Sequence, residues 1–224
     1  MILLSQIQKY WNTLFILFNI LLIIFDLALL ILPFRVLNIL SNYNIILDFF
    51  KPIIYPVIIC SGFLGLLSIF IGFIGIWKKK NILICMHIIG LIIATIIEIS
   101  ISISSSVSNN QYFKPANQSL WNSLQYYRKH PIYENQFDNL QKDFECCGVR
   151  SSKDYAKLVE YLPFTCEKGN ALYLKGCAEA LYEYIEQSIM IIIYICIAFA
   201  IIKAIYLAIS ILVYRKSDKN NLSI

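Results

Sequence analysis

Four long apolar runs constrain this chain more than any other feature of its sequence. Each run is long enough, at 1.5 Å of helix rise per residue, to cross the roughly 30 Å hydrocarbon core of a bilayer. The chain of 224 residues is 58% hydrophobic and only 15% charged, whereas soluble domains carry about a quarter charged residues. We therefore predict a membrane protein with four transmembrane helices, at residues 11–33, 53–77, 82–103 and 188–214.

The basic residues indicate how these helices cross the membrane. One side of the predicted membrane carries Lys9, Lys78, Lys79, Lys80, Arg215, Lys216 and Lys219. The short loop on the opposite side has only Arg35 and Lys51. Because positive charge is retained on the cytosolic side, both chain ends are predicted to be cytosolic. The cytosolic segments are then residues 1–10, the hairpin 78–81 and the tail 215–224, and the segments on the outer side are a small loop, 34–52, and a large loop, 104–187.

The net charge of +5 does not indicate a nucleic-acid surface. The large loop, 104–187, holds nine Lys and Arg against ten Asp and Glu, so it is close to neutral. We expect no nucleic-acid partner, because such partners require a basic patch or stripe.

Four of the seven cysteines lie in the large loop, at Cys146, Cys147, Cys166 and Cys177. Adjacent cysteines do not readily bridge each other, so Cys146 and Cys147 must each pair with one of the other two, which leaves two pairings open. The absence of Cys-x-x-Cys spacing and the oxidising side of the membrane favour disulfides over a zinc site.

The large loop also shows helical periodicity. One stripe comprises Leu120, Trp121, Leu124 and Tyr127, and a second comprises Tyr133, Phe137, Leu140 and Phe144. A third helix is predicted to run from Ala178 into the fourth span, and residues 148–176 are predicted to be irregular. The predicted fold is all-α: a four-helix transmembrane bundle with a small helical, disulfide-stapled extracellular domain between spans three and four.

Two positions are candidates for covalent modification. Asn117-Gln118-Ser119 is a glycosylation sequon on the outer side. Cys85 lies four residues past the cytosolic hairpin, where it can accept palmitate or remain a free thiol.

Polar residues within the predicted spans are Asn19, Asp26, Glu98 and Lys203. A charge near the bilayer centre costs about 2.5–3.5 kcal/mol, so each charged group is expected to find a partner. Helix rise places Lys203 nearer in depth to Asp26 than to Glu98, so we predict a Lys203–Asp26 ion pair, with Glu98 as the alternative partner. Asn19 is predicted to make an interhelical hydrogen bond. The charged groups also motivate an alternative function, that of a small transporter or channel subunit.

No motif for catalysis or metal binding is present in the sequence. It lacks a nucleophile elbow and a phosphate-binding loop, and neither His87 nor His130 has a metal-ligand pattern nearby. We expect no enzyme activity, no metal and no cofactor.

Several short motifs stand out along the chain: Cys146-Cys147-Gly148, Pro163-Phe164-Thr165-Cys166, Cys177, Asp154-Tyr155, Gly72-Phe73-Ile74-Gly75 and Glu98. On these motifs the chain resembles the tetraspanin family over nearly its whole length, with Thr165 in place of the usual Ser. The resemblance implies disulfides between Cys146 and Cys177 and between Cys147 and Cys166. Asp26 and Lys203 depart from the family pattern.

The resemblance implies a non-catalytic organiser of other membrane proteins. Its partners would be other membrane proteins, a second copy of the chain included, and membrane lipids, and its splayed spans can hold a sterol or lipid. It would reside in the plasma membrane or in endosomal or vesicular membranes. Within residues 148–176, we predict that partners contact Tyr155, Tyr161, Phe164 and Tyr173.

Overall fold

A computed structural model describes the backbone of residues 2–48, 52–78, 80–107, 113–158, 162–169 and 171–221. The chain divides into two compact units, which are described one at a time. The membrane unit comprises Met1–Pro33, Pro56–Ser104 and Ile192–Ile224, and the loop unit comprises Phe34–Tyr55 and Ser105–Ile191.

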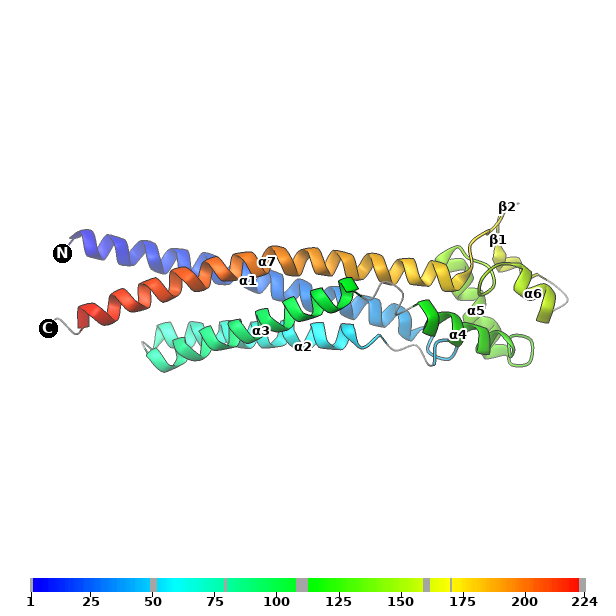
Figure 1. Cartoon of the computed structure of the whole chain (residues 1–224), viewed down its shortest axis with the longest axis horizontal. Helices are drawn as coiled ribbons and strands as arrows, with labels where there is room; N and C mark the ends of the chain where they lie inside the picture. The colour runs from blue at the N-terminus through cyan, green and yellow to red at the C-terminus, as the bar shows by residue number, and fades with distance from the viewer. Residues whose placement is uncertain are drawn as a thin grey trace. The chain divides into compact units, whose positions relative to one another are not determined.

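Four long helices supply the membrane unit (Figure 1): α1 (Ile2–Ser41), α2 (Ile54–Trp77), α3 (Asn81–Val107) and α7 (Cys177–Asn221). Each contains a stretch apolar and long enough to cross a bilayer, and these stretches are Phe15–Ser41, Ile54–Trp77, Asn81–Ser104 and Cys177–Ile209. The prediction of four apolar membrane helices is therefore confirmed.

Helix α1 extends beyond the end predicted for the first span. It continues through Pro33, which lies inside the helix, and ends at Ser41. Proline removes one backbone hydrogen bond, yet membrane helices tolerate it where neighbouring groups satisfy the freed carbonyl. A helix can extend beyond the bilayer, so the end of α1 does not mark the membrane boundary. The boundary at residue 33 therefore stays a prediction.

Glycines let the helices of the membrane unit approach one another closely. A Cβ atom at Gly72 would lie 2.8 Å from the ring of His87, so α2 and α3 meet here without room for a side chain. At Gly75, a Cβ atom would lie 3.0 Å from Cβ of Leu83. Small residues at helix contacts are typical of membrane bundles, where van der Waals packing drives association.

The loop unit is built from short elements between α3 and α7. They are α4 (Phe113–Leu124), α5 (Pro131–Phe144), α6 (Lys153–Leu158), the 3-10 turn η1 (Phe164–Cys166), and the strands β1 (Glu167–Lys168) and β2 (Ala171–Leu172). The strands pair antiparallel, with Glu167 opposite Leu172 and Lys168 opposite Ala171. Residues 148–176, predicted to be irregular, thus contain a helix, a turn and a hairpin.

The two helical stripes predicted in the loop contribute to its core. Leu120 and Leu124 of α4, and Phe137 and Leu140 of α5, are almost completely buried. The N-terminal turns of α7 add buried residues to the loop unit, namely Cys177, Ala178, Leu181 and Ile185. The predicted small helical, disulfide-stapled domain is confirmed.

Candidate functional site: the disulfide-held loop and the buried polar groups of the membrane unit

Two disulfides join the segments of the loop unit. Cys146 is bonded to Cys177, the first residue of α7, and Cys147 is bonded to Cys166, the last residue of η1. This is the pairing that the family resemblance implied. Two neighbouring cysteines therefore tie the end of α5 to two separate segments of the chain.

The backbone around the cysteine pair explains why glycine follows it. Helix α5 ends at Phe144, its C-cap residue Glu145 has a left-handed φ of 48°, and Gly148 has a φ of 65°. A Cβ atom at Gly148 would lie 2.2 Å from the carbonyl oxygen of Ser151. Any other residue would therefore meet both a backbone clash and an unfavourable conformation. The carbonyl oxygen of Gly148 itself accepts a hydrogen bond from α7, since the N–H of Cys177 donates to it at 2.9 Å.

A buried glutamine organises the polar contacts beside the Cys147–Cys166 disulfide. The Gln141 side chain donates from Nε2 to the hydroxyl of Tyr155, and its Oε1 accepts from Thr165 Oγ1 at 2.8 Å. Gln141 is fully buried, so an unmade hydrogen bond there would cost about 1–3 kcal/mol. One α5 residue thereby fixes both α6, through Tyr155, and η1, through Thr165.

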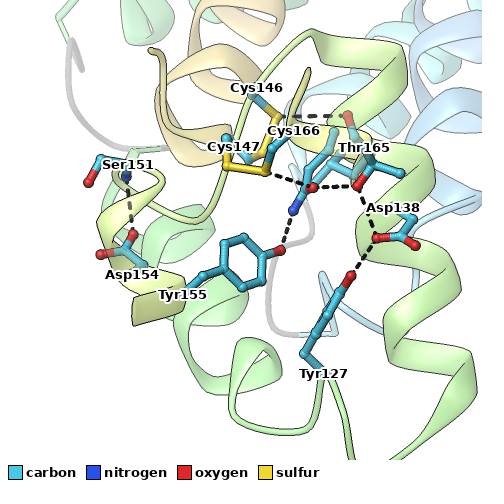
Figure 2. The surroundings of a disulfide bond; sticks show 12 residues. Tyr127, Asp138, Cys146, Cys147, Ser151, Asp154, Tyr155, Thr165 and Cys166 are labelled. Atoms are coloured by element: carbon cyan, nitrogen blue, oxygen red, sulfur yellow. Dashed lines mark hydrogen bonds between the residues drawn. A yellow bond between two sulfur atoms is a disulfide. The ribbon is translucent and has the colours of Figure 1, made fainter. Parts of the chain in front are cut away.

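Asp138 extends this network, as Figure 2 shows. Its Oδ1 accepts from Tyr127 at 2.6 Å and from Thr165 Oγ1 at 3.1 Å. Burial, and then the hydrogen bond to Asp138, raise the pKa of Tyr127 well above its ordinary value. Sequence reasoning missed the structural roles of Asp138 and Gln141, although both lie on the α5 face beside the apolar stripe.

The Asp154-Tyr155 pair closes the turn after the cysteines. Asp154 Oδ2 accepts from the backbone N–H of Arg150 at 2.6 Å and of Ser151 at 3.1 Å. The Tyr155 ring packs edge-on against Tyr127, with 5.3 Å between the ring centroids, and Tyr155 is only 1% exposed. The prediction that Tyr155 contacts partners is therefore wrong, because its ring fills the core of the loop unit.

The other described residues that were predicted to contact partners differ in exposure. Phe164 is 94% exposed, whereas Tyr173 is only partly exposed and its backbone N–H donates to Cys166 O at 2.9 Å. Tyr161 lies outside the described residues. Large apolar side chains are also exposed close to Phe164 along the chain and across the hairpin. We call these four residues the apolar tip: Leu162, Phe164, Leu172 and Leu174.

The glycosylation sequon lies on α4. Asn117 is partly exposed, but Ser119 is 1% exposed, and its Oγ donates to Ile46 O at 3.2 Å. The folded loop therefore hides one of the two residues that a glycosylating enzyme must recognise. Glycosylation of Asn117 stays a prediction, and it requires transfer of the glycan before the loop has folded.

Three charged side chains meet inside the membrane unit. Lys203 Nζ lies 2.7 Å from Glu98 Oε1 and 3.7 Å from Asp26 Oδ1. Both distances are within ion-pair range, so the predicted Lys203–Asp26 pair is present, but Glu98, the alternative partner, is the nearer of the two. Depth along a helix does not report the direction in which a side chain points around it, which is why the depth estimate failed. Because both carboxyl groups pair with Lys203, the three groups do not favour the transporter or channel alternative.

A second set of polar groups joins all four helices of the membrane unit. His87 Nδ1 lies 2.7 Å from Ser68 O, and its Nε2 lies 3.0 Å from the hydroxyl of Tyr206. Asn19 Nδ2 donates to the same hydroxyl at 3.3 Å and to Phe15 O at 2.8 Å. Asn19 thus makes the predicted interhelical hydrogen bond, between α1 and α7.

Three cysteines of the membrane unit are not part of a disulfide. Cys85 and Cys60 are exposed free thiols, and Cys196 is a buried one. Exposure is compatible with lipidation of Cys85, which stays a prediction. Over the parts of the chain that the structure describes, no group of three or more His, Cys, Asp and Glu side chains could hold a metal ion.

Known proteins match this chain along most of its length. A family model described as the tetraspanin family matches residues 11–216. A 25 kDa integral membrane protein of Schistosoma japonicum is 35% identical over 203 residues, which cover 91% of this chain and 88% of the relative. The CD63 antigen of Bos taurus is 23% identical over 171 residues, covering 70% of this chain and 71% of the relative. The leukocyte surface antigen CD53 of Bos taurus is 22% identical over 165 residues, covering 74% and 73%.

Proposed function

Because the chain belongs to the tetraspanin family, whose members are known as non-catalytic scaffolds, we propose that it organises partner membrane proteins within the bilayer. It is a multi-pass integral membrane protein, and its family suggests lateral association with other membrane proteins. Partner membrane proteins would bind the large loop as well as the helices, with no catalytic step.

The exposure of Phe164 carries the proposal for the loop. A phenylalanine that is 94% exposed leaves most of its apolar surface in water, which disfavours this arrangement unless a partner covers the ring. Leu174, at 89% exposed, adds a second apolar side chain to the tip. Interfaces are enriched in aromatic anchors of this kind, and a few such residues carry most of the binding free energy.

The disulfide next to Phe164 supports its role as an anchor. Cys166, two residues along the chain, is bonded to Cys147, and Thr165 is hydrogen-bonded to Asp138 and Gln141. The chain under the exposed ring is thus held by the disulfide and by the Thr165 hydroxyl, whose one hydrogen is shared between two acceptors. A fixed backbone loses less conformational entropy on binding, which raises affinity.

The proposed function also implies a membrane location and lipid contacts. We propose that the loop unit lies on the outer side of the plasma membrane or of an endosomal or vesicular membrane, and that both chain ends are cytosolic. Membrane lipids, a sterol included, would occupy the surfaces of the spans, and no cofactor is required.

The test is recovery of partner membrane proteins with tip variants. Phe164→Ser and Leu174→Ser in the full chain should lower the recovery of partners, because truncating a central anchor costs about 2 kcal/mol or more, which is about thirtyfold in affinity. Ile132→Ser is the matched control, since Ile132 is an exposed apolar residue of the same unit on α5. Equal recovery with all three variants and the wild type, after quantitative mass spectrometry, would rule out the tip as the partner surface.

A further inference from the structure

The charged cluster of the membrane unit is completely enclosed. Asp26 of α1 and Lys203 of α7 are 0% exposed, and Glu98 of α3 is 1% exposed. The ammonium group lies 5.2 Å from the ring centroid of Phe25, and that ring stacks on Phe199 at 3.5 Å. Two carboxyl groups and one ammonium group thus share a site from which water is largely excluded.

The two carboxyl groups are not equivalent partners of the lysine. Glu98 Oε1 accepts a hydrogen bond from Lys203 at 2.7 Å, which is the distance of a charge-assisted bond. Asp26 Oδ1 lies 3.7 Å from the same nitrogen, beyond hydrogen-bonding range. Among the described residues, neither carboxyl oxygen of Asp26 has a hydrogen-bond partner. Glu98 is therefore the counter-ion of the ammonium group.

The carboxyl group of Asp26 also lies in a close-fitting space against α2. A Cβ atom at Gly65 would lie 2.3 Å from Asp26 Oδ2, so the acid occupies the room that a side chain on α2 would need. Gly65 itself brings no charge that could compensate an ionised Asp26.

The charges of the site do not balance when every group is ionised. Two carboxylates and one ammonium leave a net charge of −1 in a medium that strongly disfavours an uncompensated ion. The only other titratable group described near the site is the thiol of Cys196 on α7, which interacts electrostatically with Glu98 and Lys203 and supplies no positive charge. One added proton would make the site neutral.

We propose that Asp26 is a proton-binding site inside the membrane. Its carboxyl group holds one proton as a neutral acid, while Glu98 and Lys203 form an ion pair beside it. The cluster then has no net charge, and the acid hydroxyl becomes a donor on an otherwise acceptor-only side chain. Of the two carboxyl groups in the cluster, Asp26 is thus the one that carries a proton at neutral pH.

Infrared spectroscopy of the full chain in lipid bilayers at neutral pH tests this assignment. A protonated carboxyl group gives a carbonyl stretching band separate from the carboxylate bands. We expect such a band, shifted when the side-chain carboxyl carbons of aspartate carry ¹³C and unmoved by the same label in glutamate. Absence of the band, or a shift with labelled glutamate, would overturn the proposal. These measurements use the wild-type chain, so they do not depend on the folding of a variant.

Charge-removing variants give a second, independent pattern. Asp26→Asn keeps the shape of the side chain and should abolish the band. Glu98→Gln leaves Asp26 as the only counter-ion of Lys203, so the acid should ionise and the band should again vanish. Lys203→Met removes the ammonium group, and both acids should then be protonated, roughly doubling the band. A band that persists in Asp26→Asn would contradict the assignment.

Discussion

At the scale of single residues, the roles that matter most depend on close contacts that a sequence does not display. The glycine after the cysteine pair is recognisable as part of a motif. Glycine is required there because the carbonyl of Ser151 leaves no room for a side chain. The charged groups within the spans could be identified from the sequence, since ionisable residues in apolar runs are rare. The choice of Glu98 over Asp26 could not, because it depends on the rotation of three helices about their axes.

Replacement of Gly148 by alanine should destabilise the loop unit more than the same change at Gly169. Both glycines have a φ of 65°, so alanine costs about 1–2 kcal/mol at each. A Cβ atom at Gly169 would meet nothing within 4 Å, whereas one at Gly148 would overlap the Ser151 carbonyl. The check is the temperature at which the loop loses protease resistance, and equal temperatures for the two variants would show that the contact at Gly148 is unimportant.

Glycosylation of Asn117 is a second prediction at this scale. Treating the full chain with a glycosidase should increase its mobility on a gel, and Asn117→Gln should show the same mobility without treatment. Because Asn117 is partly exposed, the substitution should change stability by less than about 0.5 kcal/mol. Identical mobility of treated and untreated wild type would mean that the sequon is unoccupied.

At the scale of elements, the long helices were predictable and the short ones were not. Apolar runs and helical stripes suffice to predict α1, α2, α3, α4, α5 and α7, because each has several residues that agree with one periodicity. Helix α6 has only six residues, and β1 and β2 have two each. Elements of this length have no periodicity to detect, and the Cys147–Cys166 disulfide and the Gln141 contacts hold them in place.

The burial of Tyr127 and Tyr155, whose rings contact each other, predicts how the loop unit responds to alkaline pH. Burial, more than any other cause, raises the pKa of both tyrosines above their ordinary value of 10. Since the unfolded chain loses these protons first, their contribution to stability is complete below pH 10 and is lost as pH rises above it. Unfolding followed by tyrosine absorbance should show this loss.

Phenylalanine variants isolate this effect from other groups that titrate in the same range. Tyr155→Phe keeps the ring and its packing against Tyr127 but removes the ionisable hydroxyl. Its stability should fall less steeply above pH 10 than that of the wild type, although it starts lower because Gln141 loses a hydrogen-bond partner. Parallel curves would show that Tyr155 does not contribute to the alkaline transition.

At the scale of the whole molecule, the sequence reveals the class of protein better than its contacts with partners. Four apolar runs, a neutral loop with four cysteines and the distribution of lysines predict a four-span membrane protein with a disulfide-held outer domain. The Cys146-Cys147-Gly148 motif adds the resemblance to the tetraspanin family, and the family model agrees. The partner surface was harder to predict, since Tyr155 and Phe164 look equally suitable in the sequence. Only their packing separates them, with one ring in the core and the other in solvent.

The most direct test of partner binding by the apolar tip is photo-cross-linking in intact cells. A photoreactive phenylalanine analogue is placed at position 164, and, as the control, at position 132 on the exposed face of α5. We predict that position 164 cross-links to other membrane proteins, that position 132 does not, and that Cys147→Ser with Cys166→Ser abolishes the cross-links. Equal cross-linking at the two positions, or none at position 164, would contradict the proposed role of the tip.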